Sequence, residues 1–155
     1  MNYYEQKAKI AYELYLKGLP FKKVYATVQK GDKFVVLKHE EGKYKYSLSG
    51  GGVDPGEDNV TAIKREILEE LNINIKVVKS LGIAKYVRTW HYNGKHFDVD
   101  YEAEIFHTKF ASYGENKNFG LEGEFTTKKI SIDEISKEEM LANVAEFVTF
   151  GIKFE

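Results

Sequence analysis

The sequence predicts a domain of the α/β class, in which a mixed β-sheet is flanked by helices on both faces. The chain has 155 residues, the size of one ordinary domain, so a single domain over residues 1–155 is expected. Hydrophobic residues make up 43% of the chain and charged residues 30%, which is the balance of a soluble globular protein. Strand-like and helix-like segments are mixed without strict alternation, and this indicates a mixed sheet.

The first third of the chain predicts one helix and three strands. The helix is expected over residues 4–17, because apolar side chains recur there at helical spacing and Gly18 followed by Pro20 supplies a stop signal. Three extended segments are predicted next, over residues 24–29, 33–39 and 44–48. Lys30-Gly31-Asp32 separates the first two and has the chemistry of a hairpin turn.

The middle of the chain predicts a loop, a helix and a second hairpin. The glycine-rich segment 50–56 is expected to be a loop, since glycine alone reaches positive φ without steric cost. Residues 59–71 have the pattern of a helix. Asn93-Gly94 marks a tight turn. The strands that it joins are expected over residues 75–89 and 99–109.

The last third of the chain predicts a loop, a strand and a helix. The loop is expected over residues 112–123 and the strand over 125–130. A final helix is expected to begin near Ser136, which together with Glu139 fits a capping box.

Charge and composition exclude several classes of partner. The formal net charge of −1 argues against a broad surface for long nucleic acid, although a small anionic ligand fits. The absence of cysteine excludes a disulfide framework and a thiolate zinc site, and suits a reducing compartment. The N-terminus lacks the apolar segment of a signal peptide, and no run of about 18 apolar residues is present. We therefore expect a cytoplasmic protein with no membrane partner, and a homodimer stays open.

The helix over residues 59–71 has two distinct faces. Four apolar residues fall within roughly 80° of one another at about 100° per residue and are predicted to face the core: Val60, Ile63, Ile67 and Leu71. Glu66, Glu69 and Glu70 fall on an adjacent arc of roughly 100°, which they share only with Ala62. The helix therefore presents a carboxylate strip beside its buried side.

A divalent cation is the natural partner of this carboxylate strip. Like charges at helical spacing repel by about a few tenths of a kcal/mol per pair unless something neutralises them. Mg²⁺ prefers oxygen ligands and is usually shared between one or two carboxylates and substrate phosphates. Such an ion polarises a phosphoryl group and activates water. The alternative is that the strip is a solvated face, as on many amphipathic helices.

Arg65 is expected to connect the glycine-rich loop to the helix. Its azimuth points away from the carboxylate strip, where an ion pair with Glu57 would tie the loop in place. The carbonyl groups of the loop, among them that of Gly50, would then lie close to the metal.

The spacing of these residues resembles the Nudix box, Gly-x5-Glu-x7-Arg-Glu-U-x-Glu-Glu-x-Gly-U, in which U is apolar. The match runs from Gly51 to Ile73 and covers about a seventh of the chain. One position departs, since Asn72 stands where the box has glycine. A left-handed residue is wanted at this helix end, and Asn is the next best residue for that conformation.

The resemblance implies a fold, a reaction and a set of roles. The fold is an α/β/α sandwich with a mixed sheet, and the reaction is hydrolysis of a nucleoside diphosphate linked to another moiety, with Mg²⁺ or Mn²⁺ as cofactor. Glu66, Glu69 and Glu70 would bind the metal, and Glu66 would help to deprotonate water. Glu66, Glu70, Arg65 and Glu57 form the implied catalytic set.

Family members often add a metal-binding carboxylate from a later loop. Glu122 and Glu124 lie in or beside the polar segment before the final strand, and either is a candidate. The alternative is that both are ordinary surface charges. The following segment, 129–135, resembles the strand-to-helix junction of many Nudix sequences and bears on the fold only.

Candidates for binding the rest of the substrate lie near the second hairpin turn. Trp90 and Tyr92 precede Asn93-Gly94, and a ring there could stack on a base. Cross-strand packing is the alternative for both rings. Arg88 could meet a phosphate, or it could be a solvated charge.

Two classes of function fit the sequence. The first is a metal-dependent hydrolase that cleaves a phosphoanhydride bond in a small nucleotide-like substrate. The second is a Nudix-fold module that binds a nucleotide without cleaving it, which fold cannot exclude. The complete set of three carboxylates favours the hydrolase. A Nudix-like isomerase is disfavoured, because that chemistry usually wants a cysteine and the chain has none.

Overall fold

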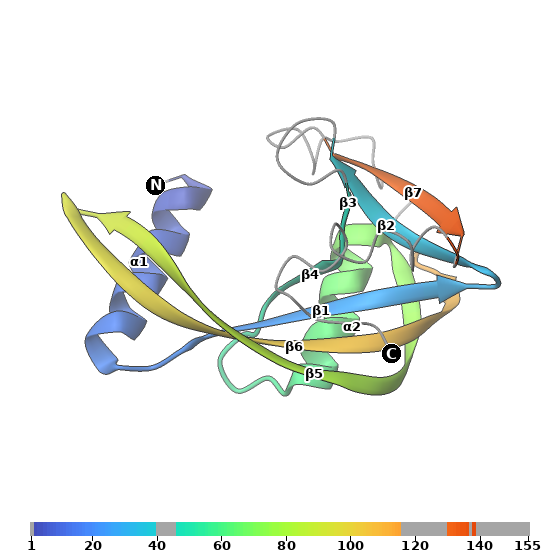
Figure 1. Cartoon of the computed structure of the whole chain (residues 1–155), viewed down its shortest axis with the longest axis horizontal. Coiled ribbons are helices and arrows are strands. Elements are labelled where there is room, and N and C mark those ends of the chain that lie inside the picture. Colours follow the sequence, from blue (N-terminus) through green and yellow to red (C-terminus); the bar gives the residue numbers. More distant parts are fainter. Residues whose placement is uncertain (1, 40–45, 116–129, 137, 139–155) are drawn as a thin grey trace.

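The computed structural model describes residues 2–39, 46–115, 130–136 and 138 (Figure 1). In these residues the chain forms two helices and seven strands, which in chain order are α1 (Tyr3–Lys17), β1 (Phe21–Lys30), β2 (Lys33–His39), β3 (Tyr46–Ser47), β4 (Ser49–Gly52), α2 (Asn59–Leu71), β5 (Ile73–Tyr92), β6 (Lys95–Tyr113) and β7 (Ile130–Ser136). None of the helices in the described residues is long and apolar enough to cross a membrane.

The strands form one mixed sheet. Its order is β3-β2-β1-β6-β5, while β4 pairs with β1 and β7 pairs with β2 beside this path. β1 and β6 run parallel, with Phe21 opposite Tyr101, and the other pairings are antiparallel. The predicted α/β class with a mixed sheet is therefore confirmed.

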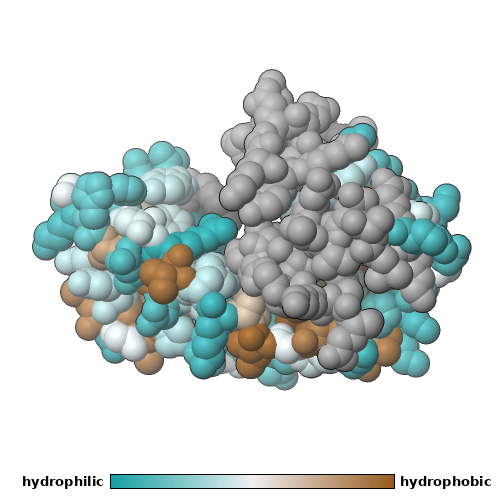
Figure 2. Space-filling model, viewed as in Figure 1, coloured by the Kyte–Doolittle hydropathy of each residue, from teal (hydrophilic) through white to brown (hydrophobic). Residues whose placement is uncertain are grey.

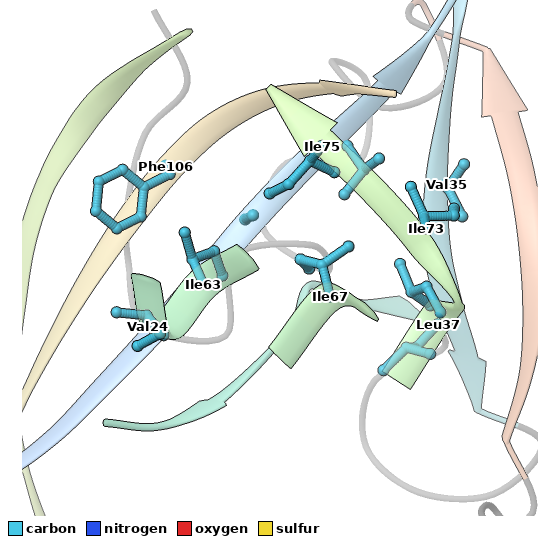
Figure 3. Close-up of a cluster of buried hydrophobic side chains, with 12 residues drawn as sticks. Val24, Val35, Leu37, Ile63, Ile67, Ile73, Ile75 and Phe106 are labelled. Carbon is cyan, nitrogen blue, oxygen red and sulfur yellow. The ribbon is translucent and has the colours of Figure 1, made fainter. Parts of the chain in front are cut away.

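Helix α2 packs its apolar side against strands β1 and β5 of the sheet. Ile63 and Ile67 are fully buried, and Figure 3 shows both pointing at side chains of the strands, among them Val24 and Phe106. Burial of this kind stabilises by about 1.5–3 kcal/mol for each large aliphatic side chain. The core therefore fixes the height and rotation of the helix that carries the glutamates.

The prediction for the core-facing side of this helix was wrong at two positions. Val60 is 42% exposed, whereas Ala62, which was placed among the glutamates, is fully buried. The helix is rotated toward Ala62, which packs in the same core cluster as Ile63 and Val24. The rotation brings Glu66 toward β4 as well, and it leaves Glu69 exposed.

Several predicted boundaries are corrected. The glycine-rich segment begins as strand β4 and not as a loop, since Gly50, Gly51 and Gly52 pair with β1. The strands of the second hairpin are longer than predicted, and β6 extends to Tyr113, inside the predicted loop. Residues 130–136 form a strand where a junction to a helix was expected. Most of the predicted strand 125–130, the end of the loop 112–123 and the helix after Ser136 lie outside the described residues.

Helix α1 lies beside the far end of the β5–β6 hairpin, at one end of the molecule (Figure 1). It ends at Lys17 and is capped by Gly18, which has φ +66°, so the predicted stop signal is confirmed. Aromatic rings join the helix to the hairpin: Tyr12 packs on Tyr92 and Phe97, with centroids 5.4 and 5.3 Å apart. The face shown in Figure 2 is mainly hydrophilic, with separate hydrophobic positions among the coloured residues.

Candidate active site

The ends of helix α2 are fixed by two capping residues. The Asp58 carboxylate accepts a hydrogen bond of 2.7 Å from the backbone N–H of Thr61, which satisfies one of the free donors of the first turn. At the other end Asn72 has φ +55° and ψ +42°, the left-handed conformation expected for this position. Its carbonyl accepts a 2.7 Å bond from the N–H of Gly114. Asn72 therefore adopts the left-handed backbone conformation expected where the box has glycine.

Two glycines of β4 allow close approaches that a side chain would prevent. A Cβ at Gly50 would overlap the Val24 carbonyl and lie 2.8 Å from the Tyr25 ring. A Cβ at Gly51 would overlap the Glu66 carboxyl group. The glutamate is thus packed directly on the backbone of β4, and the first glycine of the motif is needed for that contact.

Arg65 joins the loop to the helix, as predicted. Its Nε and Nη2 each donate a 2.9 Å hydrogen bond to one oxygen of Glu57, which is the bidentate geometry of a strong pair. Nη2 also donates to the Gly52 carbonyl at 2.9 Å. Loop, strand β4 and helix α2 therefore share one guanidinium group.

The orientation of Arg65 differs from the prediction in one respect. Its Nη1 reaches the carboxylate strip, donating to Glu66 at 2.9 Å and to Glu69 at 3.3 Å. The side chain of Arg65 is long enough to reach the neighbouring glutamates. The direction of its Cα–Cβ bond around the helix therefore does not determine where its charge lies. The same guanidinium offsets part of the repulsion within the strip.

The carboxyl groups of the site lie in different electrostatic environments. Burial raises the pKa of the Glu66 carboxyl, and the hydrogen bond and charge of Arg65 oppose that rise. The hydrogen bonds from Arg65 hold the pKa of Glu57 at about 2. The Glu66 side chain is 16% exposed, against 60% for Glu69, so the strip runs from the β4 backbone to solvent.

The donor set of the helix fits a hard divalent ion by its chemistry. Glu66, Glu69 and Glu70 supply carboxylate oxygens, which Mg²⁺ and Mn²⁺ accept. Within the described part of the chain, no three His, Cys, Asp or Glu side chains already converge in a geometry that could hold a metal ion. Two of the three glutamates instead face Arg65.

Comparison with known proteins decides the family. A family model described as the NUDIX domain matches residues 21–149. The chain belongs to the Nudix family. Membership supports hydrolysis of a pyrophosphate bond as its general reaction. No curated protein sequence matches the chain significantly.

Solved structures, among them one of a Nudix hydrolase, share the fold. A Nudix hydrolase from Nitrosomonas europaea is 24% identical, with a TM-score of 0.55 over 84% of this chain and 81% of that one. A UDP-X diphosphatase is 19% identical, with a TM-score of 0.53 over 84% of this chain and 59% of that one. A MutT protein from Methanosarcina mazei Go1 is 19% identical, with a TM-score of 0.52 over 79% and 82%.

The remaining candidates from the sequence are not gathered at the Nudix helix. Trp90 packs on Tyr4 with centroids 5.4 Å apart and donates a 2.7 Å hydrogen bond to the Tyr101 hydroxyl, at the hairpin end beside α1. Tyr92 packs on Tyr12. Arg88 is exposed and lies over two tyrosine rings. Glu122 and Glu124 lie outside the described residues.

Two lysines near the Nudix box were missed by sequence reasoning. Lys23 lies on β1 opposite Gly52, and its charge lowers the pKa of the Glu66 carboxyl. Lys7 comes from α1, and a Cβ at Gly52 would lie 3.7 Å from its Nζ. The signal for Lys23 was its place one residue before the predicted strand 24–29. No local signal points to Lys7, because only the long-range packing of α1 brings it there.

Proposed function

We propose that this Nudix chain hydrolyses a phosphoanhydride bond in a nucleoside diphosphate linked to another moiety, with Mg²⁺ or Mn²⁺ as cofactor. The observation that carries the proposal is the packing of the Glu66 carboxyl on the backbone of Gly51, with Arg65 holding both elements. A solvated charged face would not need a glycine beneath a carboxylate. The contact therefore favours a functional role for the strip.

We assign metal binding to Glu66, Glu69 and Glu70, with the Gly50 carbonyl and either Glu122 or Glu124 as further proposed ligands. A metal ion held there supplies polarisation of the phosphoryl group and a water of lowered pKa. Glu66 is oriented by Arg65 and by the β4 backbone, so we assign to it the acceptance of the proton from the attacking water. Glu70 is half-buried on the same side of α2 and completes the set.

Arg65 and Glu57 act as positioning residues in this proposal. Their two parallel hydrogen bonds fix the turn before α2, and the Glu57 carboxylate also accepts a 3.1 Å bond from the Asp54 N–H. Misplacement of a reacting group by about 1 Å can reduce a rate by about 100-fold. The pair therefore holds β4 and Glu66 in a fixed position relative to each other.

The organic part of the substrate is assigned less directly. We propose Arg88 as a contact, because its guanidinium lies 5.7 Å above the Tyr101 ring and is exposed. Trp90 and Tyr92 stay candidates, although both pack against α1. A single domain, a cytoplasmic location and a homodimer are likewise proposals that rest on the sequence.

A substrate panel tests the proposed reaction. Purified protein is incubated with nucleoside triphosphates, nucleoside diphosphate sugars and dinucleoside polyphosphates, with Mg²⁺ or Mn²⁺ and with EDTA. The hydrolase releases phosphate, pyrophosphate or a nucleoside monophosphate with metal only, and Glu70→Gln lowers kcat strongly, because it removes a proposed ligand of the metal that polarises the phosphoryl group. Binding of a nucleotide without turnover, and with Glu70→Gln unchanged, would establish the alternative binding module.

A further inference from the structure

Ser49, the first residue of β4, carries a buried hydroxyl group without a hydrogen bond. The residue is 1% exposed, and its Oγ atom has no hydrogen-bond partner among the described residues. A hydroxyl group can donate one hydrogen bond and accept two. Burying such a group unpaired costs free energy, because it loses its hydrogen bonds to water and gains none in return. Folding alone therefore does not explain a serine at this position.

The other buried serine and threonine residues of the described chain do have partners. Thr108 Oγ1 donates a 2.8 Å hydrogen bond to the Thr27 carbonyl, and Thr27 Oγ1 lies 2.8 Å from His107 Nδ1. Most buried side-chain polar atoms in native proteins are paired in this way. Ser49 is the exception, and its hydroxyl is available for a further hydrogen bond.

The Ser49 side chain lies on the side of the sheet that faces helix α2. Residues directly opposite each other in antiparallel strands share one face of the sheet. Ser49 lies opposite Ala26 and Gly51 lies opposite Val24, and both of these β1 residues belong to the core cluster that contains the buried side of α2. Ser49 therefore faces the same side as the contact between Gly51 and Glu66.

The position of Ser49 along the helix follows from two contacts. Arg65 reaches the Gly52 carbonyl and Glu66 packs on Gly51, so β4 and α2 run in opposite directions. Two residues back along a strand cover about 6.6 Å, and four residues forward along a helix cover about 6 Å. The step from Gly51 to Ser49 thus matches the step from Glu66 to Glu70, and the hydroxyl faces the turn that carries Glu70.

The Glu70 side chain is half-buried and extends toward β4. Burial is the main reason that the pKa of Tyr25 is raised, and the charge of Glu70 adds to that rise. Tyr25 lies opposite Gly50, the residue that follows Ser49. A carboxylate has about four lone-pair sites, so it can bind a metal ion and also accept a hydrogen bond from the protein.

We propose that Ser49 is a positioning residue of the metal site, and that its hydroxyl donates a hydrogen bond to the Glu70 carboxylate when the metal ion is bound. This role rests on the proposed metal binding by Glu70. Partners that orient metal ligands raise the affinity for the ion. Ser49 also precedes Gly50, whose carbonyl is a further proposed ligand, so the start of β4 supports the site at two successive residues.

Ser49→Ala is expected to have opposite effects with and without metal. In EDTA the variant should melt about 2–4 °C above the wild type, because an unpaired buried group is removed from a domain of this size. Its dissociation constant for Mn²⁺, measured from the electron paramagnetic resonance signal of the free ion, should rise about tenfold. A serine with a purely structural role would not produce this reversal. Ser49→Thr, which keeps the hydroxyl, should retain most of the affinity for Mn²⁺.

Thr108→Val is the matched control, because it removes an equally buried hydroxyl that already has a partner. This variant is expected to melt below the wild type in EDTA and to bind Mn²⁺ with unchanged affinity. It separates the loss of any buried hydroxyl from the loss of the one beside Glu70.

A double-mutant cycle tests whether Ser49 acts through Glu70. Adding Ser49→Ala to Glu70→Gln should leave the affinity for Mn²⁺ unchanged, since the accepting carboxylate is already absent. Adding it to Glu69→Gln, which removes a carboxylate that is 60% exposed, should still weaken binding about tenfold. An equal loss in both backgrounds would overturn the assignment of Glu70 as the acceptor.

Two further results would overturn the role of Ser49 while leaving the proposed hydrolase intact. One is an unchanged affinity for Mn²⁺ in Ser49→Ala, and the other is a lower melting temperature of that variant in EDTA. A wild type that binds no Mn²⁺ would instead contradict the proposed function, and the role of Ser49 with it.

Discussion

Arg65 and Glu57 are joined by two parallel hydrogen bonds of 2.9 Å, although eight positions separate them in the chain. Glu57 closes the turn before α2 and Arg65 stands in the middle of that helix. The same guanidinium reaches the Gly52 carbonyl and the Glu66 carboxylate. The pair therefore connects the backbone of β4 with the proposed metal-binding residues, and it makes Glu57 a source of pH dependence.

Glu57→Gln is expected to flatten the loss of stability in acid. Arg65 lowers the pKa of Glu57 from 4.5 to about 2 in the folded protein. Folding therefore favours the ionised carboxylate, and this stabilisation is complete above pH 4.5 and is lost as the pH falls toward 2. The free energy of unfolding, measured with urea between pH 7 and pH 3, should fall less steeply in Glu57→Gln than in the wild type.

Glu13→Gln is the control for the loss of one acidic group, because Glu13 is an exposed residue of α1. Its pH profile should follow that of the wild type. If Glu57→Gln also followed the wild type, the ion pair would not form in solution.

Gly51→Ala is expected to weaken the binding of Mn²⁺. The added Cβ overlaps the Glu66 carboxyl, which must move away from β4. Changes to the residues that orient metal ligands typically cost about 10- to 100-fold in affinity, and we expect a loss in that range by titration with Mn²⁺. In Gly52→Ala the added atom meets only ordinary contacts of 3.7 and 3.8 Å, so Mn²⁺ affinity should be kept. Equal affinities in both variants would exclude the role assigned to Gly51.

Ile67→Ala is expected to lower the free energy of unfolding by about 2–5 kcal/mol, because Ile67 is fully buried between α2 and the sheet. Val60→Ala should change it by less than about 0.5 kcal/mol, since Val60 is 42% exposed. Chemical denaturation of both variants checks the rotation of the helix. A larger effect at Val60 would mean that its side chain is buried in the core, which contradicts the described rotation.

The sequence predicted helix α2 to the residue because several local signals agree there. Its apolar spacing and the residue wanted at Asn72 both act within the segment itself. The pairing of Arg65 with Glu57 was likewise predicted from spacing. The hairpins followed from turns whose chemistry is local, such as Asn93-Gly94.

The rest depends on contacts between distant segments. The burial of Val60 and Ala62 was predicted wrongly because the rotation of α2 about its axis depends on its contacts with the sheet. The apolar periodicity of the helix holds no information about those contacts. β4 itself was not predicted, since its glycines have low strand preference and form a strand only by pairing with β1. Lys7 and Lys23 come together through the packing of α1 and the register of β1, and neither is encoded in a local motif.

Anomalous diffraction from crystals soaked in Mn²⁺ tests the central claim most directly, since it locates the ion and not only its effect. We expect a manganese peak within coordination distance of carboxylate oxygens from Glu66 and at least one of Glu69 and Glu70, with Arg65 Nη1 withdrawn from the strip. A peak elsewhere, or no peak with these three glutamates still facing Arg65 or solvent, would contradict the metal-dependent hydrolase proposed for this chain.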